Sequence, residues 1–189
     1  MKTLIVISLF SLFLVSGNAF ANDTKMAIID VKDVESGSKK VQNFRKEIEK
    51  KQSKYQDEIK KLEEKIQKDA NSLKEKSSTL SSEQLKKEEA KLKKDIDNYS
   101  AKAQKYNAVM EFVKGYGVQD LNKCLWDSVS SYAKQEKIDL VMPASSVMYV
   151  SSNVLNITNE TVKSLDSSSC KIDAASYFKK AESDAEKIK

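Results

Sequence analysis

Between Val41 and Val113 the apolar residues recur mostly every three or four positions, which is the spacing of one face of an α-helix. Two runs share this spacing. The first contains Phe44, Ile48, Tyr55, Ile59, Leu62, Ile66 and Leu73, and the second contains Leu85, Leu92, Ile96, Tyr99, Ala103, Tyr106, Met110 and Val113. The apolar stripe is narrow, which is typical of the seam between two helices of a coiled coil.

The two runs are joined by SSTLSSEQ, residues 77–84, in which clustered Ser and Thr favour a turn. Ser81 and Gln84 have the spacing of a capping box, so the second helix is predicted to begin there. Folding back about Thr79 sets apolar residues opposite each other, in the pairs Leu73–Leu85, Ile66–Leu92, Leu62–Ile96, Ile59–Tyr99, Tyr55–Ala103, Ile48–Met110 and Phe44–Val113. The pattern predicts a long antiparallel helical hairpin over residues 39–113, here called the arm.

A second apolar face appears beside the seam near the end of the arm. Its members are Val109, Phe112, Tyr116 and Val118. Gly115 and Gly117 interrupt this stretch and each lower helix propensity by about 1 kcal/mol. Two interpretations stay open: the helix enters the folded body here, or the stretch is a flexible joint whose apolar patch contacts a partner. The helix is predicted to continue to about Lys137.

Residues 140–159 contain no charged side chain, although the rest of the chain is rich in lysine. Three interpretations of this segment are possible: a membrane span, a buried sheet or an oligomer interface. Short β-prone runs at 138–142 and 147–150 are separated by Pro143-Ala-Ser-Ser, which predicts a β-hairpin, and MAIID at 26–30 predicts a third strand. Interspersed Ser and Asn exclude a membrane-spanning helix. Thr158 is predicted to cap a short helix through Leu165.

Three short strands make a small sheet with open edges, which needs further strands for stability. Copies from neighbouring chains would supply them. The predicted fold class is therefore mainly α with a small β part (α+β), in which the arm projects from an oligomeric body formed by residues 22–38 and 114–166. The residues assigned to the oligomer body are Ile28, Ile29, Leu140, Val141, Val147, Tyr149 and Val150.

The N-terminus has the form of a secretory signal peptide over residues 1–21. Lys2 precedes an apolar run from Leu4 to Val15, and Ala19-Phe20-Ala21 has the small-x-small form of a cleavage site. The apolar run is short for a membrane span of about 20 residues. The mature chain is therefore predicted to be exported and to begin at Asn22.

Composition supports an elongated helical protein, because 32% of the residues are charged and there are only four Gly and one Pro. Residues 39–105 hold 20 Lys and Arg against 13 Asp and Glu, a net charge of +7. Interleaved acids favour a solvated helix face, with an anionic membrane or acidic partners as alternatives. Export and a single arginine, Arg45, argue against nucleic acid.

The sequence offers little for catalysis. There is no His, which removes the usual general base and the commonest metal ligand, and two Cys alone make no zinc site. We therefore expect no enzymatic activity, no metal and no cofactor. Cys124 and Cys170 suit an oxidising compartment. They would pin the C-terminal extension, residues 167–189, to the second long helix if they pair within the chain; free thiols and pairing between chains are the alternatives.

Several segments together resemble the Skp (OmpH-type) periplasmic chaperone family. They are MAIIDV near the mature N-terminus, the Lys/Glu/Gln-rich hairpin, and KIDLVMPASSVMYVSSNVLNITNETVKSL. The resemblance covers residues 25 to about 166, and its most specific part is Asp139-Leu140-Val141, Ala144, Val147, Tyr149, Ser151-Ser152, Ile157-Thr158 and Val162-Lys163. Cys124, Trp126, the pair Gly115 and Gly117, and residues 167–189 have no counterpart in the family pattern.

The resemblance implies a homotrimer with a small β-barrel body shared between subunits and three helical tentacles around a cavity. It also implies a periplasmic holdase that binds unfolded outer-membrane proteins without ATP. Val109, Phe112, Tyr116 and Val118 are then the candidate client contacts. Two alternatives are an exported coiled-coil spacer between envelope layers and an envelope protein whose basic arm binds anionic lipid or lipopolysaccharide.

Overall fold

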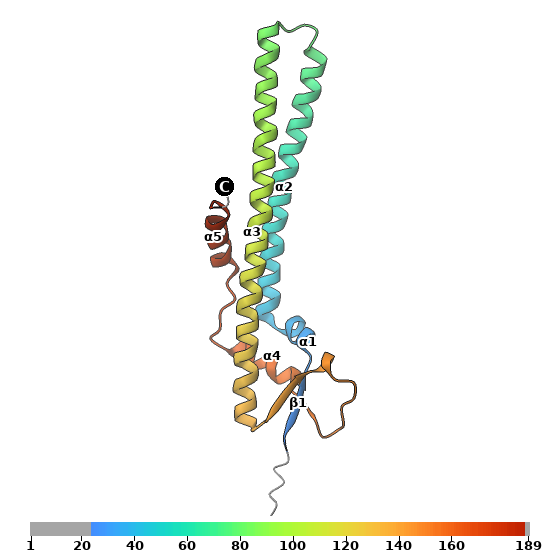
Figure 1. Ribbon diagram of the computed structural model, residues 1–189, viewed down its shortest axis with the longest axis vertical. Helices are drawn as coiled ribbons and strands as arrows, with labels where there is room; N and C mark the ends of the chain where they lie inside the picture. The colour runs from blue at the N-terminus through green and yellow to red at the C-terminus, as the bar shows by residue number, and fades with distance from the viewer. Residues whose placement is uncertain (1–23, 188–189) are drawn as a thin grey trace, which may run out of the picture.

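The computed structural model describes residues 24–187, so the predicted signal peptide lies outside the described residues. Most of the chain is helical, with a small sheet at one end (Figure 1). Two long helices, α2 (Lys39–Lys76) and α3 (Ser82–Glu136), form an antiparallel pair that stands away from this sheet. At a rise of 1.5 Å per residue, the 38 residues of α2 span about 57 Å. The arrangement is α+β with an elongated helical arm.

The ends of the two long helices follow the local sequence. Ser38 caps α2 by accepting a hydrogen bond from the backbone N–H of Val41. The capping box predicted from Ser81 and Gln84 is confirmed, since each side chain accepts from the other residue's backbone N–H. α3 runs without a break through both glycines and ends at Glu136, and its C-cap residue Lys137 adopts a left-handed backbone conformation with φ of 54°.

Near the base of the arm, two aromatic side chains contact residues about one helical turn away from their predicted partners. Tyr55 stacks on Tyr106, with ring centroids 3.8 Å apart, where the sequence predicted Ala103. The ring of Phe44 lies against Gly117, in the same core cluster as its predicted partner Val113. Gly117 has no side chain and leaves room for the large ring. The heptad pattern predicts which residues form the seam, but the size and shape of the aromatic side chains determine which residues they contact across it.

The sheet is parallel and open within one chain. β1 (Met26–Ile29) lies between β2 (Leu140–Pro143) and β3 (Leu155–Asn156), in the order β2-β1-β3. Ala27 pairs with Val141 on one side and with Leu155 on the other. The strand predicted at 147–150, and with it the β-hairpin, is wrong.

The reason lies in the direction of the strands. Because β2 and β3 both run parallel to β1 on its opposite sides, a tight hairpin cannot join them. The chain passes instead through a short 3-10 helix, η1 (Ala144–Ser146), and a loop that returns to the start of β3. Residues 147–150 belong to this loop.

The body core lies between the sheet, the lower part of α3, α1 (Val31–Gly37) and α4 (Thr158–Ser167). Its buried apolar residues are Ala27, Ile29, Val34, Val41, Cys124, Ile157 and Leu165. α4 is preceded by Ile157 as its N-cap, so the predicted cap at Thr158 is wrong by one residue. The Thr158 hydroxyl instead accepts a hydrogen bond from the backbone N–H of Asp30, which ties α4 to the end of β1.

Asp166 of α4 caps the N-terminus of α2 from a distant part of the chain. Its carboxylate accepts hydrogen bonds from Ser38 Oγ at 2.6 Å, and from the backbone N–H groups of Lys39 at 3.1 Å and Lys40 at 3.2 Å. Burial alone would raise the pKa of Asp166, but these hydrogen bonds outweigh it and lower the pKa. A carboxylate is well suited to the unpaired N–H groups at the start of a helix. The body therefore fixes the point from which the arm begins.

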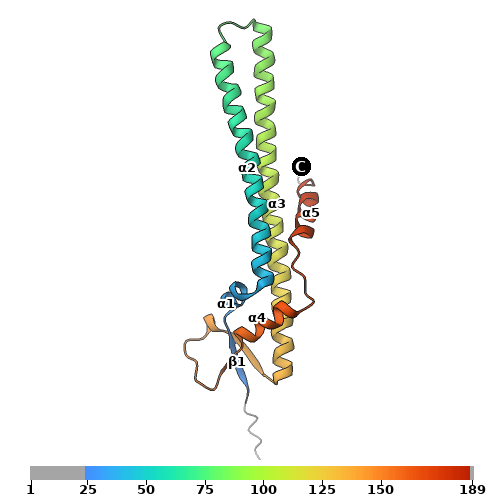
Figure 2. The ribbon, with the colours of Figure 1, turned by 180° about the vertical axis from the view of Figure 1, so that it is seen from behind.

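The C-terminal extension returns to the arm. A disulfide joins Cys124 of α3 to Cys170, with Cα atoms 5.7 Å apart, and fixes the segment after α4 against the long helix. The chain then forms α5 (Ala174–Ala185), capped by the Asp173 side chain, which accepts from the backbone N–H groups of Ala175 and Ser176. Figures 1 and 2 show α5 alongside α3, over the half of the arm nearer the sheet.

Candidate functional site

The base of the arm is a three-helix section with a core of its own. α5 contributes Tyr177 and Phe178 together with three small residues, Ala174, Ala181 and Ala185. The arm contributes Phe44, Tyr55, Val109, Met110 and Val113. The Phe44 and Tyr177 rings meet edge to face, with centroids 5.8 Å apart. Aromatic side chains from all three helices thus meet at one place.

Tyrosine hydroxyls and carboxylates bind α5 to the arm around this core. Tyr55 donates to Glu182 at 3.0 Å, Tyr116 donates to Asp184 at 2.6 Å, and Tyr177 donates to Asp120. Burial and the hydrogen bond to Glu182 raise the pKa of Tyr55 well above its ordinary value, and burial and Asp120 do the same for Tyr177. Both hydroxyls therefore remain protonated donors across the physiological pH range.

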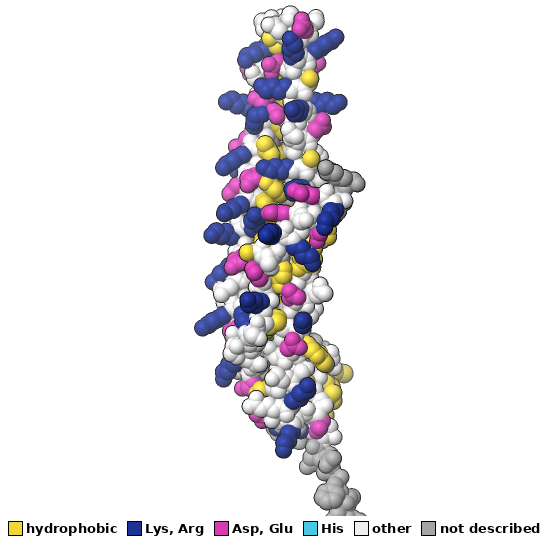
Figure 3. All heavy atoms as spheres, turned by 90° about the vertical axis from the view of Figure 1, so that its left-hand side faces the viewer, with side chains coloured by type: hydrophobic (Ala, Val, Ile, Leu, Met, Phe, Trp, Pro, Cys, Tyr) yellow, Lys and Arg dark blue, Asp and Glu magenta, His cyan; other side chains and the backbone are white. Residues whose placement is uncertain are grey.

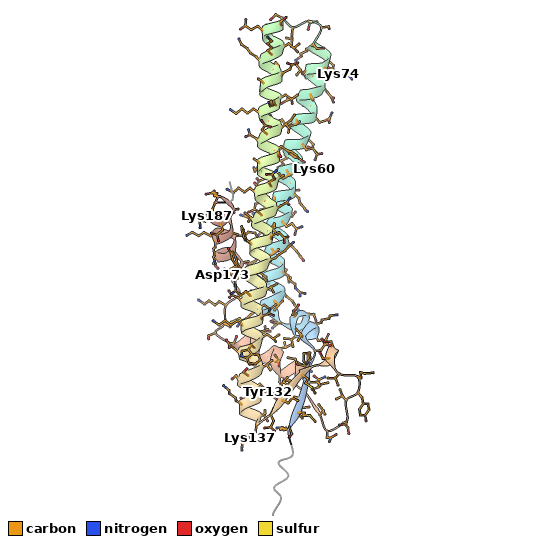
Figure 4. The ribbon with its side chains drawn as sticks, viewed as in Figure 1. Lys60, Lys74, Tyr132, Lys137, Asp173 and Lys187 are labelled. Carbon is orange, nitrogen blue, oxygen red and sulfur yellow. A yellow bond between two sulfur atoms is a disulfide. The ribbon has the colours of Figure 1, made fainter. Side chains whose placement is uncertain are left out.

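Lysines complete the rim of this contact. Lys51 forms an ion pair with Glu182 at 3.3 Å, and its ammonium group lies over the rings of Tyr55 and Phe178. Lys180 lies over the Tyr116 ring at 4.1 Å. In Figure 4, Asp173 and Lys187 mark the two ends of α5, so its C-terminal end points toward the tip of the arm. These rim pairs are solvated and individually weak.

Three of the four predicted client contacts lie within or beside the α5 contact. Val109 is fully buried, and Phe112 and Tyr116 are half-buried and stacked with their ring centroids 6.2 Å apart. Val118 alone is exposed, at 58%. The apolar face seen in the sequence is real, but α5 occupies much of it.

The rest of the arm is thinly packed. Between residues 56 and 108 no side chain is fully buried, and the seam residues there are half-buried or exposed. A shallow groove lies in the seam where this region meets the three-helix section, with apolar lining residues Tyr55, Ile59, Ala103, Tyr106 and Met110. On the face that Figure 3 shows, basic and acidic side chains cover the arm, with apolar strips between them. This part of the arm has the character of a long, charged surface with shallow apolar contacts.

The open sheet and its loop form a second exposed apolar area. Its members are Met26, Leu140, Met148, Tyr149, Val150 and Leu155, and Met148 and Tyr149 are 106% and 82% exposed. Of the residues assigned to an oligomer body, Ile29 is buried in the chain's own core, and Ile28, Val141 and Val147 are half-buried. Leu140, Tyr149 and Val150 are exposed.

Within residues 24–187, the structure contains no group of three or more His, Cys, Asp or Glu placed to hold a metal ion. In the same part of the chain, no helix has the length and apolar character needed to cross a membrane.

The residues of α5 that build the site were not predicted as site residues. A signal for them exists in the sequence: Asp173 has the side chain of an N-cap, and Ala174, Phe178, Ala181 and Ala185 are spaced four, three and four apart. The segment is short and mostly small or charged, so its apolar face was too narrow to indicate a contact with the arm.

Residues 25–165 match the OmpH family, described as outer membrane protein (OmpH-like), and the chain belongs to this family. The match spans the arm and the body and ends before α5. Among solved structures, the chain is similar to the crystal structure of a candidate outer membrane chaperone (OmpH-like) from Caulobacter crescentus. The TM-score is 0.70 and the identity 15%, over 78% of this chain and 87% of the other, so this likeness concerns the fold. No curated protein matches the chain at a significant level.

Proposed function

We propose that this protein is an ATP-independent holdase chaperone of the periplasm, which binds unfolded outer-membrane proteins and prevents their aggregation. The observation that carries the proposal is the family match over residues 25–165, which takes in both the arm and the body. The Caulobacter protein of the same fold is described as a candidate outer membrane chaperone. The predicted signal peptide is consistent with a periplasmic location.

The arm suits the holding of unfolded chains better than the recognition of one small ligand. The seam groove is shallow and has a volume of about 350 Å³, which is far too small to enclose a polypeptide. Many weak contacts can nevertheless hold a chain when they act together. Several arms around one client would raise the effective concentration of contacts and so the overall affinity.

We infer that three copies assemble through the body, with their small sheets combined into a shared barrel. Both edges of the three-stranded sheet are open, and exposed apolar residues lie on the edge strands (Leu140, Leu155) and in the loop between them (Met148, Tyr149, Val150). Such edges are normally covered in a native protein. Tyr149→Asp should therefore dissociate the assembly and lower its mass in solution. Lys60→Gln, at an exposed position on the arm, should leave the mass of the assembly unchanged.

The test of the chaperone function is suppression of aggregation. The mature protein is mixed, without nucleotide, with a urea-unfolded outer-membrane β-barrel protein that is then diluted, and light scattering is followed. We expect suppression at one trimer per client, with faster capture at low salt because of the net charge of +7 over residues 39–105. A trimer that leaves scattering unchanged at every salt concentration would refute the holdase and favour the envelope spacer.

The alternative of an anionic-lipid or lipopolysaccharide surface predicts a different dependence. Binding to vesicles that contain anionic lipid would fall steeply with salt, and neutralising lysines such as Lys60 and Lys74 would weaken it. The holdase predicts that Phe112→Ser with Tyr116→Ser reduces client holding more than Lys60→Gln with Lys74→Gln. Figure 4 shows both lysines on α2, away from α5.

A further inference from the structure

We propose that α5 is a self-ligand of the arm: in the free protein it occupies the aromatic face that a client contacts, and an incoming apolar segment displaces it. This inference rests on the proposed holdase function. It assigns a role to the C-terminal extension, which lies beyond the residues that match the family. The surface fits an amphipathic or unfolded segment that presents aromatic and small residues.

The first argument is the identity of the covered surface. Val109 is completely buried in the core that α5 completes, and Phe112 and Tyr116 pack against the same core. Tyr116 is also hydrogen-bonded to Asp184 and covered by Lys180. Without α5, the arm would present a continuous face of aromatic and β-branched side chains. An apolar helix lying in such a groove is a common mode of peptide recognition.

The second argument is that α5 is held in a way that permits release. A helix of 12 residues is marginal by itself in water, so its helicity depends on the contact with the arm. Three of its five buried residues are alanines, which contribute little apolar area. The ion pairs of Lys51 with Glu182 and of Lys105 with Glu186 are solvated and therefore weak, and the three tyrosine hydrogen bonds are only partly buried. The contact is thus adequate to order α5 and open to competition.

The third argument concerns the connection. The disulfide holds Cys170 against α3, and only residues 171–173 separate it from the start of α5. A released α5 therefore stays close to its groove and rebinds when a client leaves. Such a short tether gives a high effective concentration, so α5 would exclude weakly binding segments and yield to clients that make many contacts.

The test uses two variants of the full chain that place the same residue on opposite faces of α5. Ala181→Glu introduces a carboxylate at a fully buried position, whereas Ser183→Glu introduces it at an exposed one. Hydrogen exchange over residues 174–185 measures release directly and requires no client. We expect faster exchange in Ala181→Glu and wild-type exchange in Ser183→Glu. Retained protection in Ala181→Glu would overturn the proposal, since α5 would then not depend on this apolar contact.

Client holding is measured in parallel. The apparent affinity for the client is proportional to the fraction of molecules in the binding-competent state, in which α5 is released. If about one wild-type molecule in ten is in this state, Ala181→Glu should raise the apparent affinity about tenfold. Adding Tyr116→Ser should abolish the gain, because the gain comes from the uncovered face. If wild type holds the client and Ala181→Glu holds it equally or less well, α5 only stabilises the fold. The self-ligand inference is then refuted, while the holdase function stands. If neither protein holds the client, the holdase function fails and the inference with it.

Discussion

Gly115 and Gly117 are two residues apart in the same helix, yet Ala should have opposite effects at the two positions. A Cβ at Gly115 would meet nothing within 4 Å. Gly115→Ala should therefore stabilise the protein by about 0.5–1 kcal/mol, because alanine loses less backbone entropy in a helix. A Cβ at Gly117 would lie 2.2 Å from Cζ and 2.5 Å from Cε1 of Phe44, far inside contact distance.

The Phe44 ring cannot move away freely, since it is 9% exposed and meets Tyr177 edge to face. Forcing extra volume into a packed core costs about 1–3 kcal/mol, which offsets or exceeds the gain in helix propensity. We therefore expect Gly117→Ala to be less stable than Gly115→Ala by about 1–3 kcal/mol. Each kcal/mol corresponds to roughly 2–4 °C in Tm for a chain of this size.

Urea and thermal unfolding followed by circular dichroism measure the difference, at one fixed protomer concentration because assembly shifts apparent stability. The double variant Phe44→Leu with Gly117→Ala supplies the control. A shorter side chain removes the clash, so the two substitutions should couple favourably. Equal stabilisation by Gly115→Ala and Gly117→Ala would refute the contact between Phe44 and Gly117, and with it the observed pairing of the arm helices.

Three further predictions concern the body and α5. Replacing Cys124 and Cys170 by Ser should lower the free energy of unfolding, measured in urea, by about 2–4 kcal/mol. A reducing agent should lower the stability of the wild type and leave that of this variant unchanged. Asp166→Asn should destabilise the protein by about 1–2 kcal/mol at pH 7. Because the folded pKa of Asp166 is lowered, its stabilisation is present above the unfolded value of about 3.9 and is lost as the pH falls through the folded pKa; the variant's unfolding midpoint should therefore change less with acid. Tyr177→Phe should lose the bond to Asp120 and speed hydrogen exchange in α5, whereas an unchanged exchange rate would mean that this bond does not hold the helix.

The sequence predicts the arm well because a coiled-coil seam is a local property. Apolar spacing identifies both helices, and Ser81 with Gln84 identifies where the second begins. The pairing near the base depends on the shape of individual side chains, and no heptad pattern shows that Phe44 requires the space at Gly117. Periodicity therefore predicts which residues form the seam more reliably than which residues meet across it.

The sheet was harder to predict because its pairing is nonlocal. Val147 and Val150 have high β-propensity, but the positions beside β1 are taken by Leu140–Pro143 and by Leu155–Asn156. β-Propensity indicates that a residue is suited to a strand, but it does not determine which other strand the residue pairs with. Only part of the site could be predicted, for a related reason. Val109, Phe112 and Tyr116 form an apolar face as predicted, but the helix that covers this face, α5, comes from residues far along the chain.

The position of β1 has a consequence for the order in which the chain folds. The backbone N–H of Lys25 bonds the Asp139 carboxylate across 114 residues, and β1 finds both of its neighbours only in the last third of the sequence. The arm needs contacts only between adjoining helices, and such contacts form before pairings that close long loops. The first strand to be synthesised therefore waits, unpaired, until residues 140–143 are present, and its second neighbour is complete only at residue 156. The finished arm already holds the start of α2 close to α3, so it shortens the loop that closure of the sheet must bridge and lowers the entropic cost of this late step.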